Sequence, residues 1–188
     1  MKTEKHYSME LRAAAADATR ERILAAASEA FLERWYDDVT IAEVARRAGV
    51  SGQTVINHFG GKEALAAAAH ARLGEELQGR RYAPEPGDTR GAVEALVDDY
   101  EITGDPTIRM LALEEKMPSL APLLETGRQG HRRWVETMFR APGLVPELVV
   151  ATDAYTWKLL RRDQGLSRDE TVASMLRIVE ALLERRTR

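Results

Sequence analysis

The sequence predicts an all-α protein. Apolar residues recur at helical spacing along most of the 188 residues, as in the series Leu65, Ala69, Leu73 and Leu77. No useful stretch alternates apolar and polar residues with a period of two, the pattern that indicates a half-buried strand. Prolines and glycines separate the helical segments, most clearly at residues 84–87. These patterns predict a small helical head followed by a larger helical body.

The first predicted helix spans about residues 18–34. Its apolar face carries Ile23, Leu24, Ala27, Ala30 and Phe31. Residues 1–16 precede this helix and are expected to form a flexible, solvated tail. The alternative is an arm that enters the DNA minor groove, for which the segment offers Lys2, Lys5, His6 and Arg12.

Residues 40–60 are the most informative segment. Thr40 and Glu43 have the spacing of a capping box, so a helix is expected to begin at residue 41. Gly49 can adopt the positive φ of a tight turn, and Ser51 can cap a second helix by accepting from its first amides. The residues expected to face inward are Val44, Ala45, Ala48, Val55 and Phe59. This arrangement predicts a helix-turn-helix.

The outward residues of the second helix are polar or small, which suits DNA. Gln and Asn side chains can make bidentate hydrogen bonds to adenine, and Thr can offer its methyl group to thymine. Hydroxyls, a lysine and the amides at helix starts can bind phosphates. The predicted DNA-binding residues are Thr40, Ser51, Gly52, Gln53, Thr54, Asn57, His58 and Lys62. The alternative is a structural helix pair in an ordinary bundle.

The sequence around this segment resembles the tetracycline-repressor (TetR) family, over about residues 20–65. The matching residues are Arg22-Ile23-Leu24, Ala26-Ala27, Phe31, Tyr36, Val39-Thr40-Ile41-Ala42, Ala45, Ala48-Gly49-Val50-Ser51, Thr54, His58-Phe59, Lys62 and Leu65. The resemblance implies a three-helix head, a connecting helix, and an all-helical body that dimerises and often binds a small-molecule inducer. It also implies that Thr40 and Lys62 hold phosphates and that Gln53, Thr54, Asn57 and His58 lie on the recognition helix.

Two residues depart from the family pattern. Trp35 stands where glycine is usual after the first helix, so we expect that turn to be built differently. Ile56 replaces a common tyrosine whose hydroxyl reaches a phosphate, so one anchor is missing and DNA binding is expected to weaken modestly. Within this frame we expect a DNA-binding domain at residues 17–62 and a ligand-binding and dimerisation domain at residues 63–188.

The body is predicted to end in two helices, at about residues 144–163 and 168–186. Ser167 and Glu170 form a second capping box at the start of the last helix, and Pro106 is expected to restart an earlier helix near its first position. The last two helices are the predicted dimer interface, with Leu148, Tyr155, Leu159, Leu176, Val179 and Leu183. The alternative is that this apolar stripe packs on the chain's own core.

Aromatic and methionine residues in the middle helices predict a mostly apolar ligand pocket. The predicted lining is Tyr100, Met110, Met117, Trp134, Met138 and Trp157. Arg109, His131 or Asp153 could orient a polar group of the ligand. For any one of these residues the alternative is a place in the ordinary core or surface.

Composition and motifs argue against several other classes of protein. The chain has no cysteine, and its four histidines are far apart, so neither a disulfide nor a metal site is expected. No nucleophile elbow or other catalytic motif is present, and no enzyme activity or cofactor is expected. No signal peptide or membrane span is expected, which together with the missing cysteines favours the cytoplasm. The net charge is −3, whereas residues 40–62 carry three basic residues and one acidic residue, a local charge of +2.

The sequence therefore predicts a homodimeric transcriptional regulator that binds double-stranded operator DNA. Its leading form is a repressor that a small apolar inducer releases from a palindromic operator. A regulator controlled by a protein partner, with no small-molecule pocket, is one alternative. A helical protein-interaction module that has lost DNA reading is the other.

Overall fold

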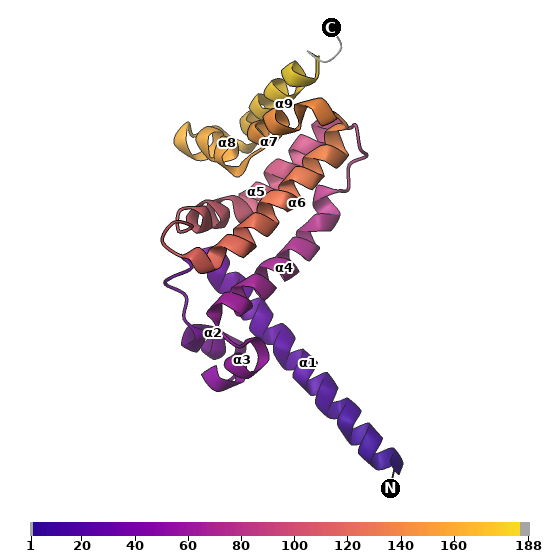
Figure 1. Cartoon of the computed structure of the whole chain (residues 1–188), viewed down its shortest axis with the longest axis vertical. Helices are drawn as coiled ribbons and strands as arrows, with labels where there is room; N and C mark the ends of the chain where they lie inside the picture. The colour runs from indigo at the N-terminus through magenta and orange to yellow at the C-terminus, as the bar shows by residue number, and fades with distance from the viewer. Residues whose placement is uncertain (1, 185–188) are drawn as a thin grey trace. The chain divides into compact units, whose positions relative to one another are not determined.

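The computed structural model describes the backbone of residues 2–184 and the side chains of residues 11–184 apart from residue 78. All regular structure in residues 2–184 is helical, which confirms the predicted fold class. The α-helices are α1 (Lys2–Glu33), α2 (Ile41–Ala48), α3 (Gly52–Phe59), α4 (Lys62–Arg81), α5 (Thr89–Leu111), α6 (Ala121–Phe139), α7 (Val145–Ala151), α8 (Ala154–Lys158) and α9 (Arg168–Glu184) (Figure 1). Short 3₁₀ turns lie at η1 (Pro118–Leu120) and η2 (Pro142–Leu144), and a π-helical turn, η3, spans Leu159–Asp163.

The chain divides into two compact units, Met1–Leu73 and Gly74–Arg188. The division falls within α4, so this helix belongs partly to each unit; the sequence predicted a boundary between residues 62 and 63, at the first residue of α4. We refer to the first unit as the head and to the second as the body.

The core of the head is formed by α1, α2, α3 and the start of α4. Ile23, Ala27, Val44, Val55 and Leu65 are wholly buried in this core. The predicted inward residues Ala45 and Ala48 are also buried, and Phe59 packs against the same cluster. Small residues at the crossing let α2 and α3 approach closely, as a helix-turn-helix requires.

The helix α1 begins at Lys2, well before the predicted start near residue 18. The added segment includes Ala13–Ala16, and alanine has the highest intrinsic helix propensity. Side chains of residues 11–18 are exposed, so helix propensity rather than burial accounts for this part of α1. The side chains of Lys2, Lys5 and His6 lie outside the described residues, and the flexible tail and the minor-groove arm stay predictions.

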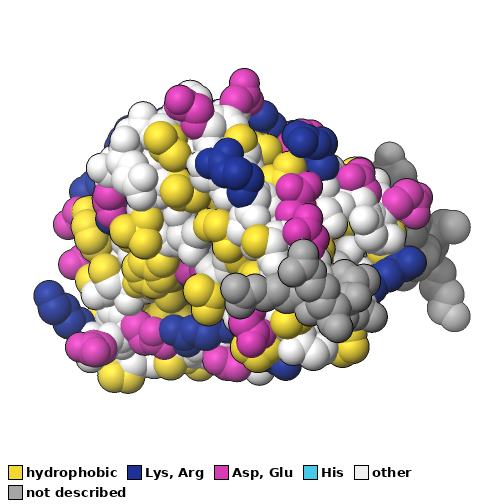
Figure 2. Space-filling view, turned by 90° about the horizontal axis from the view of Figure 1, so that it is seen from above, with side chains coloured by type: hydrophobic (Ala, Val, Ile, Leu, Met, Phe, Trp, Pro, Cys, Tyr) yellow, Lys and Arg dark blue, Asp and Glu magenta, His cyan; other side chains and the backbone are white. Residues whose placement is uncertain are grey.

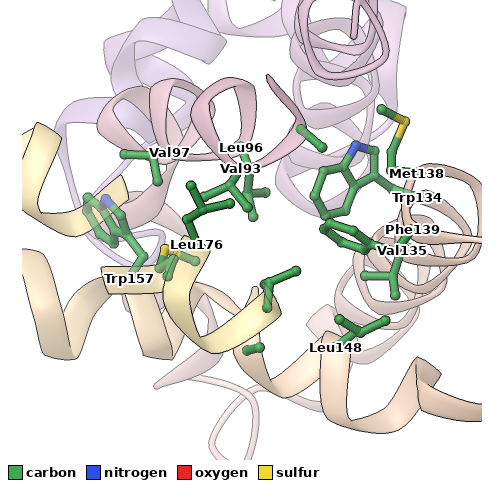
Figure 3. Close-up of a cluster of buried hydrophobic side chains, with 14 of the residues drawn as sticks. Val93, Leu96, Val97, Trp134, Val135, Met138, Phe139, Leu148, Trp157 and Leu176 are labelled. Carbon is green, nitrogen blue, oxygen red and sulfur yellow. The ribbon is translucent and has the colours of Figure 1, made fainter. Parts of the chain in front are cut away.

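The body packs α5 to α9 around a second apolar core. Leu96, Trp134, Met138, Leu148 and Trp157 are among its most deeply buried side chains (Figure 3). The capping box at the start of α9 is confirmed, because Ser167 Oγ accepts from the amide of Glu170 at 3.2 Å and Glu170 Oε2 accepts from the amide of Ser167 at 2.8 Å.

Two predicted helix boundaries in the body are wrong. A new helix was expected at Pro106, but α5 continues through this residue to Leu111. A single helix was expected over residues 144–163, but Asp153 separates α7 from α8 and accepts from the amide of Tyr155 at 2.8 Å. A side-chain oxygen that accepts from a first-turn amide stabilises a new helix start, which accounts for the break.

Among the described residues, no helix combines the length and apolar character that a membrane crossing needs.

Candidate nucleic-acid interface

The first helix of the helix-turn-helix begins at the predicted cap. Thr40 Oγ1 accepts from the amide of Glu43 at 3.1 Å. The reciprocal half of the box is not formed, because the Glu43 carboxylate pairs with Arg34 at 2.5 Å and with Arg47 at 2.9 Å. A guanidinium gives a carboxylate a charge-assisted hydrogen bond, which is stronger than one from a neutral amide. Glu43 therefore ties α2 to the end of α1 while Thr40 alone caps the helix.

The turn between α2 and α3 has the predicted geometry. Gly49 ends α2 with φ +68°, in the left-handed region that favours glycine, and the next amide, of Val50, donates to Ala45 O at 2.9 Å. Ser51 Oγ then accepts from the amide of Thr54 at 3.1 Å and caps α3. Its hydroxyl also lies 2.8 Å from that of Thr54. These contacts fix where α3 starts.

The outer surface of α3 exposes both predicted base-reading amides. Gln53 and Asn57 are exposed, and Gln53 Nε2 donates to Asn57 Oδ1 at 2.9 Å. Gly52, Thr54 and His58 are half-buried at the edges of this surface. The structure therefore places the two amides together as one polar pair, which their spacing of four residues allows.

Lys62 is the first residue of α4, and its side chain contacts the turn between α1 and α2. Its Nζ lies 4.4 Å from the centre of the Tyr36 ring and donates to Asp37 O at 3.2 Å. Burial lowers the pKa of Lys62, while the nearby carboxylates of Asp37, Glu63 and Asp38 act in the opposite direction. A cation held at this site can bind a phosphate, provided that the DNA replaces the carbonyl contact.

The turn before α2 is built without glycine, as the sequence predicted from Trp35. The amide of Asp38 donates to Trp35 O at 3.1 Å, and Trp35 itself is exposed. Among the described residues, Arg140 is the only one other than glycine with a positive φ, so Trp35 needs no left-handed conformation. The next residue, Tyr36, is buried and stacks on Phe31 with ring centres 5.7 Å apart.

Sequence reasoning counted Arg46 in the local charge but did not include it in the site. Arg46 is exposed in the last turn of α2, whereas Arg47 is drawn into ion pairs with Glu33 and Glu43 at 2.9 Å. Two adjacent arginines thus have different environments. Helical spacing did not separate the two, because Arg46 and Arg47 lie three and four residues after Glu43 and both spacings allow a pair.

The predicted pocket residues are mostly core. Tyr100, Trp134, Met138 and Trp157 are buried in the body cluster, and Figure 3 shows the two tryptophans among separate groups of core side chains. Met110 and Met117 are half-buried and do not belong to that cluster. Four of the six residues therefore belong to the ordinary core of the body, and the ligand pocket stays a prediction.

A buried polar cluster lies beside that core. The Arg81 guanidinium carbon lies 5.6 Å from the centre of the Tyr100 ring and 5.2 Å from that of Trp134. Arg81 Nη2 is 3.3 Å from His131 Nδ1, and the Nε2 of the same imidazole is 3.1 Å from Thr152 Oγ1. Burial, with a smaller effect of Arg81, lowers the pKa of His131 to about 3. His131 is therefore neutral at ordinary pH and links α6 to the end of α7.

The predicted dimer residues divide into two groups. Leu148, Leu176 and Val179 are buried in the chain's own core, so they are not available to a second copy. Tyr155 is 49% exposed and Leu159 is 54% exposed, while Leu183 is half-buried. Val150 on α7 and Ile178 on α9 are also exposed, and sequence reasoning did not include them.

Comparison with known proteins identifies the head. A family model described as "Bacterial regulatory proteins, tetR family" matches residues 23–69, which span the end of α1, the helix-turn-helix and the start of α4. The chain belongs to the TetR family. The resemblance inferred from the residues is thereby confirmed, and the TetR family is one of transcriptional regulators rather than of enzymes.

Relatives of this TetR-family chain include the regulator AlkX of Mycobacterium tuberculosis, 30% identical over 112 residues, which are 57% of this chain and 53% of that protein. The activator FasR of Mycolicibacterium smegmatis is 31% identical over 154 residues, which are 80% of this chain and 62% of that protein. The chain thus spans little more than half the length of these curated relatives. A transcriptional regulator from Rhodococcus sp. Rha1 has a similar fold, with a TM-score of 0.69 at 20% identity over 87% of this chain and 95% of that one.

Proposed function

We propose that this TetR-family protein is a sequence-specific DNA-binding regulator and that α3 is its recognition helix. The observation that carries the proposal is the hydrogen-bonded pair Gln53 and Asn57, exposed on the outer surface of α3. Amide side chains at base edges can distinguish adenine in the major groove. Ser51 caps the N-terminus of α3, the helix that carries this pair, and helix N-termini favour phosphate. DNA as the partner also places the protein in the cytoplasm.

The electrostatics of the head support this proposal. No acidic residue lies on α3, and Arg46 and Lys62 flank it on the neighbouring helices. The phosphate backbone supplies most of the affinity in protein–DNA complexes, so a basic surface around the recognition helix is needed even in a chain of net charge −3. Base contacts from the amide pair then supply specificity.

Selection against random double-stranded DNA tests the proposal. We expect wild-type protein to enrich one motif, and Gln53→Ala with Asn57→Ala to abolish the enrichment while weak, salt-sensitive binding remains. Gln129→Ala, a change to an exposed amide on α6, serves as the control and should leave the motif unchanged. A folded protein that enriches nothing contradicts the proposal and favours the protein-interaction module.

We also propose that the regulator works as a homodimer through the exposed apolar residues of α7 to α9. Tyr155 and Leu159 lie four residues apart, and Val150 and Ile178 add apolar surface from α7 and α9. Figure 2 looks onto this end of the body and shows apolar side chains exposed among charged ones. A two-fold dimer reads two half-sites one helical turn apart or a multiple of it, which predicts a palindromic motif.

Molar mass in solution tests the dimer. Leu159→Glu places a charge in the proposed interface and is expected to give a monomer at micromolar concentration. Ile102→Glu, at an exposed apolar residue of α5 outside the proposed interface, is the control and should leave the mass unchanged. A wild-type monomer would contradict the proposal.

Repression and release by a small apolar inducer are proposed on the family resemblance alone. An inducer must bind the DNA-incompetent state more tightly than the DNA-bound state, because equal affinity shifts no population. Titrating apolar compounds into the operator complex tests this proposal, and dissociation by one of them is the expected result. Operator binding unaffected by the compounds would favour control by a protein partner.

A further inference from the structure

Ile56 is an exposed apolar residue on the surface that carries the amide pair. It is 43% exposed, and it is the only exposed large hydrophobic side chain within the described parts of α2, α3 and α4. The adjacent Val55 is wholly buried, and Phe59 supplies the second inward contact of α3. The core of the head therefore does not need an apolar side chain at position 56.

Ile56 lies on the same side of α3 as both amides. It follows Gln53 by three residues and precedes Asn57 directly, and residues three apart on a helix are surface neighbours. The hydrogen bond from Gln53 Nε2 to Asn57 Oδ1, 2.9 Å long, orients the two amides. With this bond in place the pair retains an acceptor, Gln53 Oε1, and a donor, Asn57 Nδ2, which complement N6 and N7 of adenine.

The chemistry of this surface favours DNA as the partner of Ile56. The major groove presents one apolar group, the C5 methyl of thymine, beside hydrogen-bonding groups that complement amides. A β-branched side chain such as isoleucine is stiff at χ1, so it can hold a fixed position beside the amide pair. The absence of acidic residues from α3 and the presence of Arg46 and Lys62 nearby also favour a polyanion.

We propose that Ile56 is a specificity residue that contacts the methyl group of a thymine, next to an adenine read by Gln53 and Asn57. The inference rests on the proposed DNA-binding function and adds one element to it: discrimination of a base by a methyl contact. The preferred half-site then contains a thymine that the protein distinguishes from uracil.

Replacement of single thymines by deoxyuridine tests this proposal, because the change removes only the methyl group. In the motif obtained by selection, replacing the contacted thymine of one half-site is expected to weaken wild-type binding about fourfold, the value of one buried methyl-sized group. Ile56→Ala should bind thymine and deoxyuridine DNA equally, and Ile56→Val should keep most of the discrimination. Ile102→Ala, at a residue that is 41% exposed on α5, is the matched control and should behave as wild type.

The outcomes separate this inference from the proposed function. If the protein binds a specific sequence but deoxyuridine weakens binding at none of its thymines, the role of Ile56 is overturned and the DNA-binding function still stands. The same conclusion follows if Ile56→Ala retains the discrimination, or if it weakens binding equally to every sequence. If no DNA sequence is preferred, both proposals fail. Thermal unfolding of Ile56→Ala should match wild type, since the side chain is exposed.

Discussion

Gly104 lies directly against the indole ring of Trp157. A Cβ atom built on Gly104 would lie only 2.7 Å from Cε3 of that ring, and closer still to two other ring atoms. The ring cannot move away easily, because it is wholly buried and lies between Tyr100, at 5.9 Å between ring centres, and Arg162, at 4.6 Å. Close approach of α5 and α8 therefore requires glycine at this position.

Gly104→Ala is expected to destabilise the protein by about 1–3 kcal/mol, the usual cost of overpacking a filled core. Gly127→Ala is the control, because a Cβ on this helical glycine of α6 would meet nothing within 4 Å. That change should stabilise α6 by up to about 1 kcal/mol. Urea unfolding of both variants measures the difference, and equal effects of the two would show that Trp157 yields to the added methyl group.

A second prediction concerns the turn of the helix-turn-helix. Gly49 has φ +68°, where a residue with a Cβ costs about 1–2 kcal/mol. Gly49→Ala should destabilise by about this amount, and Gly49→Asn by less, because asparagine tolerates the left-handed region better. Unfolding free energies for the two variants give the measurement. If alanine is tolerated as well as asparagine, the strain assigned to this turn is absent.

A third prediction concerns the lysine at the start of α4. If Lys62 binds a phosphate, Lys62→Ala should weaken binding to every sequence alike and reduce the slope of log affinity against log salt by about one. Lys116→Ala, at an exposed lysine of the body, is the control and should leave the slope unchanged. A change of base preference in Lys62→Ala would contradict a phosphate contact.

A fourth prediction follows from the buried imidazole. The unfolded chain protonates its histidines near pH 6.5, whereas the pKa of His131 in the folded chain is about 3. Between these values the unfolded state binds a proton that the folded state does not, so the free energy of unfolding falls as pH falls, by at most about 1.4 kcal/mol per pH unit. His131→Gln should flatten this decline in urea unfolding measured from pH 7 to pH 4.

The change His131→Gln leaves the neighbouring charged side chains unchanged. Burial raises the pKa of Asp99, with Arg81 and Arg80 acting against it, so Asp99 contributes a pH dependence of the opposite sign. Asp99 is present in both proteins, so its contribution is common to the two profiles. Parallel profiles for wild type and His131→Gln would show that the pKa of His131 is the same in the folded and the unfolded chain.

The helix-turn-helix could be predicted from sequence because its signals are local. A hydroxyl cap at Thr40, a glycine turn at Gly49 and a second cap at Ser51 each act within four residues, and each has the expected contact. One prediction in this segment was wrong: Glu43 does not complete the capping box with Thr40, because its carboxylate pairs with Arg34 and Arg47. The choice of partner depends on how α1 packs, which local spacing does not specify.

The body was less predictable because its spacing patterns are ambiguous. Helical spacing does not distinguish a pocket residue from a core residue at Trp134 or Trp157. The structure places both in the core. Leu148 and Leu159 belong to one apolar stripe in the sequence, yet one is wholly buried and the other is half exposed. The break at Asp153 changes the direction of the chain between them. The single continuous helix expected from the sequence therefore could not predict which of the two leucines faces the core.

The placement of the three tryptophans gives each unit its own optical reporter. Trp35 is exposed in the head, whereas Trp134 and Trp157 are buried in the body. Indole emission shifts to longer wavelength in water, so the body tryptophans emit to the blue of Trp35 until the body unfolds. Trp35→Phe would then leave a protein whose emission follows the body alone. This one substitution thus allows melting of the body to be followed without an attached dye.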